Sequence, residues 1–73
     1  MTQSNLPYAV HVLWHSGQLM TEEIIAHCPT ESIAIHFAKL WNGLKHVTVR
    51  VVDPNGEIIF TVDDAGNESR FRT

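Results

Sequence analysis

One segment of this 73-residue sequence, residues 29–44, has the apolar spacing of an amphipathic helix, and no other segment shows it as clearly. Placed on a helix, its large apolar side chains fall in one stripe, and Lys39 and Asn42 fall opposite. The stripe is expected to contain Ile33, Phe37, Leu40 and Leu44, flanked by Ala34 and Trp41. Ile35 is expected to face outward. Because such a stripe has to be buried against a second layer, the remaining chain is expected to supply a sheet.

Polar residues mark both ends of this helix. Thr30 is a candidate N-cap, with Glu31 in the first turn, and Gly43 and Lys45 follow the apolar stripe. The predicted helix therefore covers roughly residues 30–44.

Residues 8–15 alternate with period two and predict a strand, with Tyr8, Val10, Val12 and Trp14 on one face. A Ser16-Gly17 turn would return the chain through residues 18–27 as an antiparallel partner. A two-residue loop there pairs His15 with Gln18 and Leu13 with Met20. This register places Leu19, Thr21, Glu23 and Ile25 on the face of Tyr8 and Trp14.

The segment 21–28 has a second interpretation. Thr21 followed by two glutamates is also a good helix start, and a short helix ending at Pro29 would make a helix-turn-helix with the main helix. The strand is favoured, because the first strand needs a partner and so short a helix would be marginal.

The period changes back to two after the helix. Residues 46–52 place Val47, Val49 and Val51 inward, an Asp53-Pro54-Asn55-Gly56 turn follows, and residues 57–63 return with Ile58, Phe60 and Val62 inward. A second turn, residues 63–67, precedes residues 68–72, the candidate fifth strand at an exposed edge. The expected fold class is α+β, an antiparallel sheet of four to five strands with one helix packed on one face, in the order β-β-α-β-β-β. Residues 1–73 form a single small domain, of which residues 1–6 are expected to be flexible.

Composition narrows the classes of function. Five Lys and Arg against eight Asp and Glu give a net charge of −3, which disfavours direct nucleic-acid binding and suits docking on a basic protein surface. The single cysteine, the polar N-terminus and the lack of a long apolar run predict a cytoplasmic protein with no membrane association.

Catalytic and metal chemistry find little support in the residue pattern. His11 and His15 lie four residues apart on a strand, roughly 13 Å at the strand rise, which is too far for one ion. Cys28 and His27 are adjacent on a strand and would point to opposite faces. We therefore expect no catalytic residues, no cofactor and no metal site, and a structural role for Cys28.

A one-sided sheet leaves its second face open, and here that face would be partly apolar. Its members are expected to be His11, Leu13, His15, Met20, Glu22, Ile24, Thr48, Arg50, Val52, Ile59 and Thr61. Two interpretations stay open: an ordinary mixed face, or a surface for a protein partner or a second copy. The candidate partner-binding residues are Leu13, Met20, Ile24, Arg50, Val52 and Ile59 on this face, and Asp53, Asp63 and Asp64 in the acidic turns.

Three runs of residues, 38–41, 47–56 and 58–66, resemble the C-terminal half of small proteins carried by phages and mobile elements, including anti-CRISPR inhibitors of type I CRISPR-Cas complexes. The shared features are the helix, the hairpin with its Asp53-Pro54-Asn55-Gly56 turn and a closing strand, whose expected aromatic residue is matched by Phe71. The resemblance implies an inhibitor that occupies a basic nucleic-acid-binding surface of its target. The alternative is a small dimeric bacterial domain with a structural or regulatory role.

Overall fold

The computed structural model describes residues 6–41 and 44–71, which form five strands and one helix. The elements are β1 (Tyr8–Ser16), β2 (Leu19–Cys28), α1 (Glu31–Lys39), β3 (Val47–Val52), β4 (Ile58–Val62) and β5 (Glu68–Arg70). Residues 1–5 of the segment 1–6 that was expected to be flexible, Asn42 and the expected helix-ending Gly43, and residues 72–73 lie outside the described residues.

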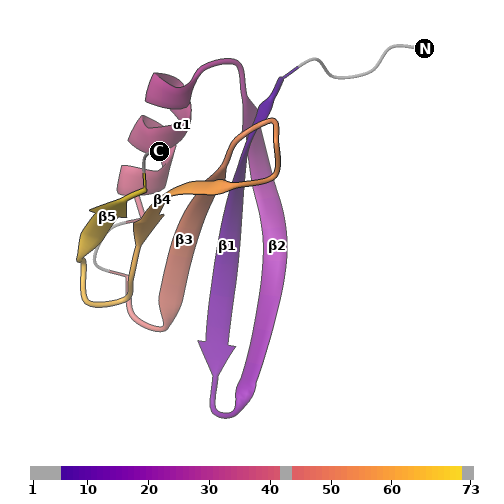
Figure 1. The fold of residues 1–73 in the computed structure, drawn as a ribbon. Coiled ribbons are helices and arrows are strands. Elements are labelled where there is room, and N and C mark those ends of the chain that lie inside the picture. Colours follow the sequence, from indigo (N-terminus) through magenta and orange to yellow (C-terminus); the bar gives the residue numbers. More distant parts are fainter. Residues whose placement is uncertain (1–5, 42–43, 72–73) are drawn as a thin grey trace.

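The five strands form one antiparallel sheet in the order β2-β1-β3-β4-β5. Figure 1 shows α1 on one side of this sheet, where it contacts β1, β2, β3 and β4. The predicted α+β fold with β-β-α-β-β-β order is confirmed, and residues 21–28 are a strand rather than a short helix. The last strand ends at Arg70, two residues earlier than expected.

The core lies between the sheet and α1. Alternate residues of the strands fill it, as period-two patterning requires. Its buried members are Val10, Val12, Cys28, Ala34, Ile35, Ala38, Val47, Val49, Val51, Phe60 and Val62. Trp14 of β1 meets Trp41, which follows α1, edge to face with ring centroids 6.1 Å apart. Trp14 is 39% exposed and Trp41 is half-buried, so the pair lies at the margin of the core.

The β1–β2 hairpin turns one residue later than predicted. Ser16 pairs with Leu19 and His15 with Met20, so the two loop residues are Gly17 and Gln18, and the predicted pairing of His15 with Gln18 is wrong. Gly17 is the first loop residue and has a positive φ of 63°, the conformation for which primed hairpin turns favour glycine at this position. The register moves by two residues, and the side-chain faces up to Ile24 are therefore kept.

A β-bulge interrupts this hairpin near the start of β1. His11 pairs with Ile24 and Val10 with Ala26, which leaves Ile25 as the extra residue. The bulge reverses the parity of β2, so Ala26 and Cys28 come onto the helix side, while Ile25 is half-buried against the core.

The helix is shorter than predicted. Thr30 is its N-cap, with its Oγ1 accepting a hydrogen bond from the Ile33 N–H at 3.2 Å, as expected. At the other end, the Leu40 N–H donates to the Phe37 carbonyl and the Trp41 N–H to the Ala38 carbonyl, both at 3.1 Å. These i to i+3 bonds are the tighter geometry in which helices commonly end, and α1 stops at Lys39 instead of continuing to residue 44.

The predicted phase of the helix is also wrong. Ile35, expected outside, is only 6% exposed, and Leu40, expected inside, is 68% exposed. The helix is turned by roughly 100°, one residue's step, relative to the prediction. The small Ala34 and Ala38 face a sheet surface already filled by Phe60 and valines, so α1 can lie close to it. Ile33 and Leu44 are exposed as well, and Phe37 and Trp41 are half-buried at the margin.

A second bulge changes the inward set of β4. Val51 pairs with Phe60 but Val52 pairs with Ile58, so Ile59 is the extra residue. Ile58, predicted inward, is exposed, and Ile59, predicted on the open face, packs against the core.

Candidate binding surface

The face of the sheet opposite α1, here called the open face, is built by cross-strand pairs. His11 of β1 stands between Ile24 of β2 and Arg50 of β3, and Arg50 is followed by Thr61 of β4. The next row joins Glu22, Leu13 and Thr48, and His15 pairs with Met20. Most of the face predicted from the alternation is therefore assembled as expected, with Ile59 as the exception.

Leu13 is only 4% exposed although it lies on the open face and outside the core cluster. Its neighbours along β1 are His11 and His15, and its partners across the sheet are Glu22 and Thr48. Side chains two apart on a strand and directly opposite on neighbouring strands are close enough to cover a leucine. Leu13, a predicted partner contact, is thus covered by its neighbours on the open face.

Two histidines on this face form hydrogen bonds. His11 Nδ1 lies 2.6 Å from Glu22 Oε2, and His15 Nε2 lies 3.0 Å from Thr48 Oγ1. The first contact joins β1 to β2 and the second joins β1 to β3, on either side of Leu13. No group of three or more His, Cys, Asp or Glu placed to hold a metal ion is found among residues 6–41 and 44–71. Cys28 is buried in the core as a free thiol.

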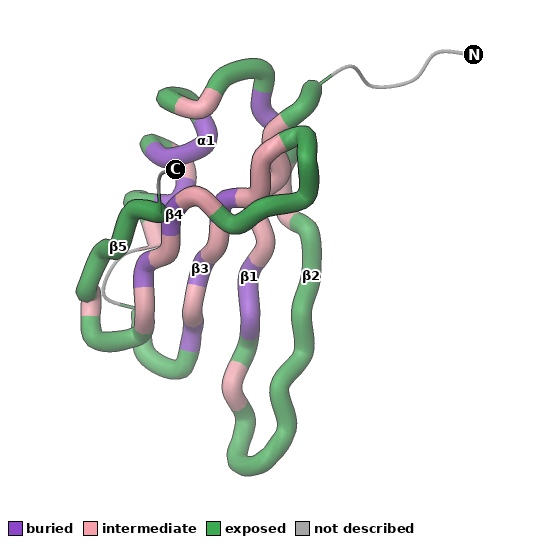
Figure 2. The backbone as a smooth tube through the Cα atoms, viewed as in Figure 1, coloured by how far each residue is buried: buried purple, intermediate pink, exposed green. Residues whose placement is uncertain are grey.

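The β2 strand carries much of the exposed apolar surface. Leu19 is 74% exposed, and Met20 and Ile24 are more than half exposed. Figure 2 shows β2 exposed along most of its length, in contrast to the buried positions that recur along β1 and β3. Of the predicted contacts, Met20 and Ile24 are therefore accessible, while Arg50 and Val52 in the middle of the sheet are half-buried.

The flank of α1 that faces away from β5 is a second exposed apolar area, on the other side of the sheet from Met20 and Ile24. Lys39 Nζ lies 3.9 Å from Glu68 Oε1, so the Ile35–Lys39 flank of the helix is turned toward β5. Ile33 and Leu40 occupy the other flank and are exposed. This flank was not predicted from the sequence, because both residues were expected in the core. The signal that could have found it is the pair Ala34 and Ala38, whose small side chains permit the closest approach to a sheet.

The two acidic turns share one structure. Asp53 Oδ1 accepts hydrogen bonds from the N–H groups of Asn55 and Glu57, at 2.9 and 2.8 Å. Asp63 Oδ1 accepts from Ala65 and Asn67 in the same pattern, at 3.0 and 2.8 Å. Gly56 and Gly66 follow at equivalent positions with φ of 85° and 88°, a conformation that favours glycine.

These contacts give both aspartates a turn-forming role. The Asn67 N–H, followed by the Asn67 amide and further N–H groups, stabilises the Asp63 carboxylate and lowers its pKa below the ordinary 3.8. Asp53 and Asp63 are thus already hydrogen-bonded within their turns. Of the three predicted acidic contacts, Asp64 is the one whose carboxylate takes no part in this pattern.

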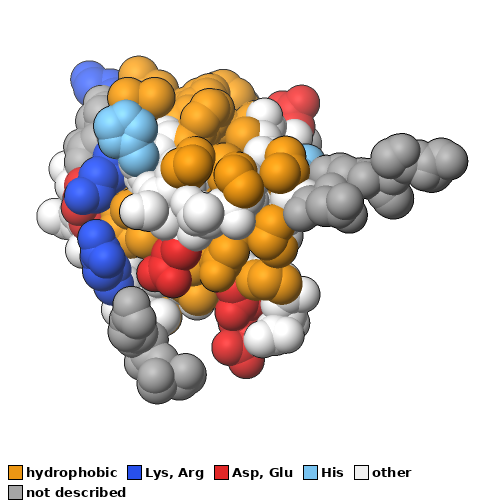
Figure 3. Space-filling model, turned by 90° about the horizontal axis from the view of Figure 1, so that it is seen from above, with side chains coloured by type: hydrophobic (Ala, Val, Ile, Leu, Met, Phe, Trp, Pro, Cys, Tyr) orange, Lys and Arg blue, Asp and Glu red, His pale blue; other side chains and the backbone are white. Residues whose placement is uncertain are grey.

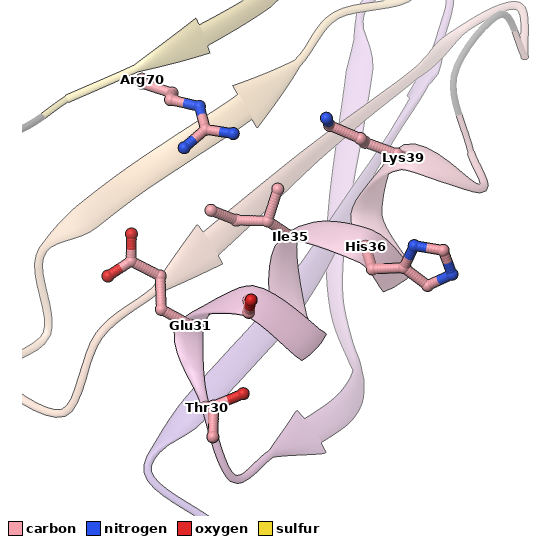
Figure 4. A pocket seen from close by; sticks show the side chains of 7 residues that line it. Thr30, Glu31, Ile35, His36, Lys39 and Arg70 are labelled. Carbon is pink, nitrogen blue, oxygen red and sulfur yellow. The ribbon is translucent and has the colours of Figure 1, made fainter.

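A shallow hollow of about 560 Å³ lies between α1 and β5. Figure 4 shows Arg70 and Lys39 extending toward the space around Ile35, with His36 directed away from it. The Arg70 guanidinium carbon lies 5.6 Å from the centre of the Phe60 ring, and Lys39 is close to Glu68. Glu31 lines the same hollow, so its charges are of both signs and select for no single class of ligand.

Charged and apolar side chains are separated on the surface. Figure 3 shows Lys and Arg gathered on the side where Figure 1 places α1 and β5, and a continuous hydrophobic area beside them. The candidate site is therefore the β2 edge, where Met20, Glu22 and Ile24 lie on the open face. Ile33 and Leu40 of α1 lie on the opposite side of the sheet and form a separate exposed apolar area.

Comparison with protein-family models, with curated proteins and with solved structures finds no match to this chain. Within residues 6–41 and 44–71, no helix has the length and apolar character needed to cross a membrane.

Proposed function

We propose that this protein is a binding module that acts on another protein by non-covalent contact, without turnover. The observation that carries the proposal is the concentration of exposed, large apolar side chains around β2. Met20 and Ile24 lie on the open face of this strand, on either side of Glu22, and both are more than half exposed. Exposed apolar side chains grouped in this way are typical of interaction sites, because burying them against a partner removes them from water.

The partner is proposed to have a basic surface. The chain carries a net charge of −3, and Glu22 and Glu23 lie in the middle of β2, among the apolar residues. Complementary charge increases the rate of encounter and disfavours wrong partners.

The specific form of the proposal is an inhibitor, encoded by a phage or mobile element, that occupies a basic nucleic-acid-binding surface of a host defence complex. The resemblance of residues 38–66 to anti-CRISPR inhibitors of type I complexes and the acidic charge support it. The second candidate is a small dimeric bacterial domain with a structural or regulatory role, since a ten-residue edge strand such as β2 can pair with another chain.

A matched pair of substitutions tests the binding module. Ile24 and Phe71 are apolar and equally exposed, at 52% and 51%, and lie on opposite sides of the molecule, β2 and the end of β5. Host proteins captured by the parent should be retained by Phe71→Lys and lost by Ile24→Lys, because a charge in a desolvated contact is costly. Equal capture by both variants would remove the β2 surface as the binding site.

Two measurements distinguish the phage-encoded inhibitor from the dimeric bacterial domain. Phage plating on a bacterium with an active type I CRISPR-Cas system should rise when the parent is expressed, and not when Ile24→Lys is expressed. Sedimentation of the pure parent should give the mass of one chain. Unchanged plating together with the mass of two chains would favour the dimeric domain.

A further inference from the structure

The two edges of the sheet differ in how they are protected. β5 is three residues long with charged residues at both ends, whereas β2 is ten residues long and places no proline along its length. Short, charged edge strands resist pairing with other chains, and long edge strands with apolar residues invite it. β2 therefore has the properties of a strand that another strand can join.

The direction of the backbone groups follows from the register. The His15 N–H donates to the His46 carbonyl at 2.9 Å, so the odd residues of β1 direct their polar backbone groups toward β3. The even residues direct theirs toward β2, where Val12 is paired with Glu23 and Trp14 with Thr21. The intervening residues of β2, which are Met20, Glu22 and Ile24, consequently direct their N–H and C=O groups off the free edge.

The same three residues place their side chains on the open face, because they pair with His15, Leu13 and His11. An incoming strand would therefore meet an apolar, an acidic and an apolar side chain at alternate positions. Glu22 Oε2 lies 2.6 Å from His11 Nδ1, yet the Glu22 side chain remains 47% exposed. A carboxylate accepts several hydrogen bonds. Glu22 can therefore bind a Lys or Arg side chain of a partner while it keeps its hydrogen bond with His11. The bulge at Ile25 bends the strand just beyond Ile24 and limits the pairing to residues 19–24.

A second copy of this chain fits this edge poorly. In a symmetric antiparallel pair, the only register that pairs all three outward residues sets Met20 against Ile24 and Glu22 against Glu22 of the other copy. Like charges directly opposite each other destabilise a strand pair. A strand with a basic residue at the central position removes this repulsion and replaces it with attraction.

We propose that β2 binds an extended segment of a partner protein as a sixth strand, with Lys or Arg opposite Glu22 and apolar residues opposite Met20 and Ile24. The proposal rests on the proposed function and specifies its binding mode: main-chain hydrogen bonds provide affinity, and the alternate side chains provide selectivity. The recognition pattern in the partner is apolar, any residue, basic, any residue, apolar.

The test uses the full chain and two blocked peptides, Thr-Val-Thr-Lys-Thr-Val-Thr and its twin with Glu in place of Lys. The Lys peptide should bind the parent at least about tenfold more tightly than the Glu peptide, as expected when attraction replaces repulsion. In an amide NMR titration, the largest shifts should appear at Met20, Glu22 and Ile24, and not at Ser69 or Arg70.

Two charge variants make the test specific. Glu22→Lys should reverse the preference and favour the Glu peptide. Glu57→Lys, which makes the same change of net charge at an exposed position between β3 and β4, should leave the preference unchanged. Circular dichroism would first establish that both variants keep the parent fold.

Binding of neither peptide, equal affinity for both, or shifts centred on β5 would overturn the proposal. Doubling of the mass of the free chain, with β2 amides shifted by concentration alone, would overturn it in favour of a second copy. If the peptides fail while Ile24→Lys still loses captured host proteins, strand addition is wrong and the binding module stands. If Ile24→Lys also captures what the parent captures, the proposed function fails as well.

Discussion

The β2 and β5 edges belong to one sheet but are held to the molecule in different ways. Charged side chains join β5 to its neighbours. The Lys39 ammonium of α1 lies 3.9 Å from Glu68, and the Arg70 guanidinium lies over the Phe60 ring of β4. The outward row of β2 instead carries exposed apolar side chains beside Glu22, on a hairpin that extends past the other strands (Figure 1). The contacts of β5 hold this edge against the helix and the core, and the exposed row of β2 is the feature on which the proposed partner binding rests.

The largest effect expected from this difference concerns the core next to β5. Phe60 is fully buried, so Phe60→Ala should lower the free energy of unfolding by about 3 to 5 kcal/mol. Met20→Ala on the β2 edge should change it by less than about 0.5 kcal/mol. Urea unfolding followed by circular dichroism measures both. A comparable loss for Met20→Ala would mean that the β2 edge supports the fold.

The two flanks of α1 provide the second test. Ile35→Ala should lower the free energy of unfolding by about 2 to 5 kcal/mol, since Ile35 is buried toward β5. Leu40→Ala, on the flank turned away from β5, should cost less than about 0.5 kcal/mol. If the order is reversed in the same unfolding experiment, the helix phase described above is wrong.

A smaller effect is expected at β5 itself. Arg70→Ala removes the cation from above the Phe60 ring and should lower the free energy of unfolding by about 0.5 to 1 kcal/mol. Arg70→Lys keeps the charge without the planar group and should recover part of this loss. Peptide binding at β2 should be the same in both variants. Weaker peptide binding in either would show that the two edges are coupled.

The smallest effect concerns the turn that leads into β5. Hydrogen bonds lower the pKa of the Asp63 carboxyl below 3.8 in the folded protein, so the carboxylate stabilises the fold above that pH. This contribution is lost as the pH falls below 3.8 through the lowered pKa. The stability difference between the parent and Asp63→Asn should therefore be constant from neutral pH to about pH 4 and shrink below it.

The matched control for this titration is Asp64→Asn, since Asp64 lies outside the hydrogen-bond pattern of the turn. Urea midpoints measured across the pH range should show a stability difference between the parent and Asp64→Asn that does not shrink below pH 4. A difference for Asp63→Asn that already shrinks between pH 7 and pH 5 would assign the effect to another group.

Much of the fold was predictable from local patterns. Alternation located the strands, Asp53-Pro54-Asn55-Gly56 marked its turn, and Thr30 marked the start of the helix, because each of these signals acts within a few residues. The bulges at Ile25 and Ile59 were not predictable from period two, since each inserts one residue to suit the partner strand. The helix phase failed because large side chains were counted as the buried stripe, whereas the filled sheet surface selects Ala34 and Ala38.

The candidate site was predicted only in part. Met20 and Ile24 are exposed on the open face as expected, but Leu13 is covered by its neighbours, which only the three-strand register reveals. Asp53 and Asp63 were predicted as partner contacts because of their charge. Aspartate is also common in turns, because its short side chain accepts hydrogen bonds from the turn backbone, and charge alone does not separate the two roles. The importance of the β2 edge depends on the order of strands in the sheet, which local sequence patterns do not specify.

Amide hydrogen exchange of β2, with and without the Lys peptide, tests the central claim most directly. In the free chain, Met20, Glu22 and Ile24 should exchange quickly, while Thr21 and Glu23, whose amides face β1, should be protected. The peptide should protect the first three amides and leave Ser69 and Arg70 of β5 unchanged. Fast exchange that persists at Met20, Glu22 and Ile24 when the peptide is in excess, or protection of these amides in the free monomer, would contradict the account.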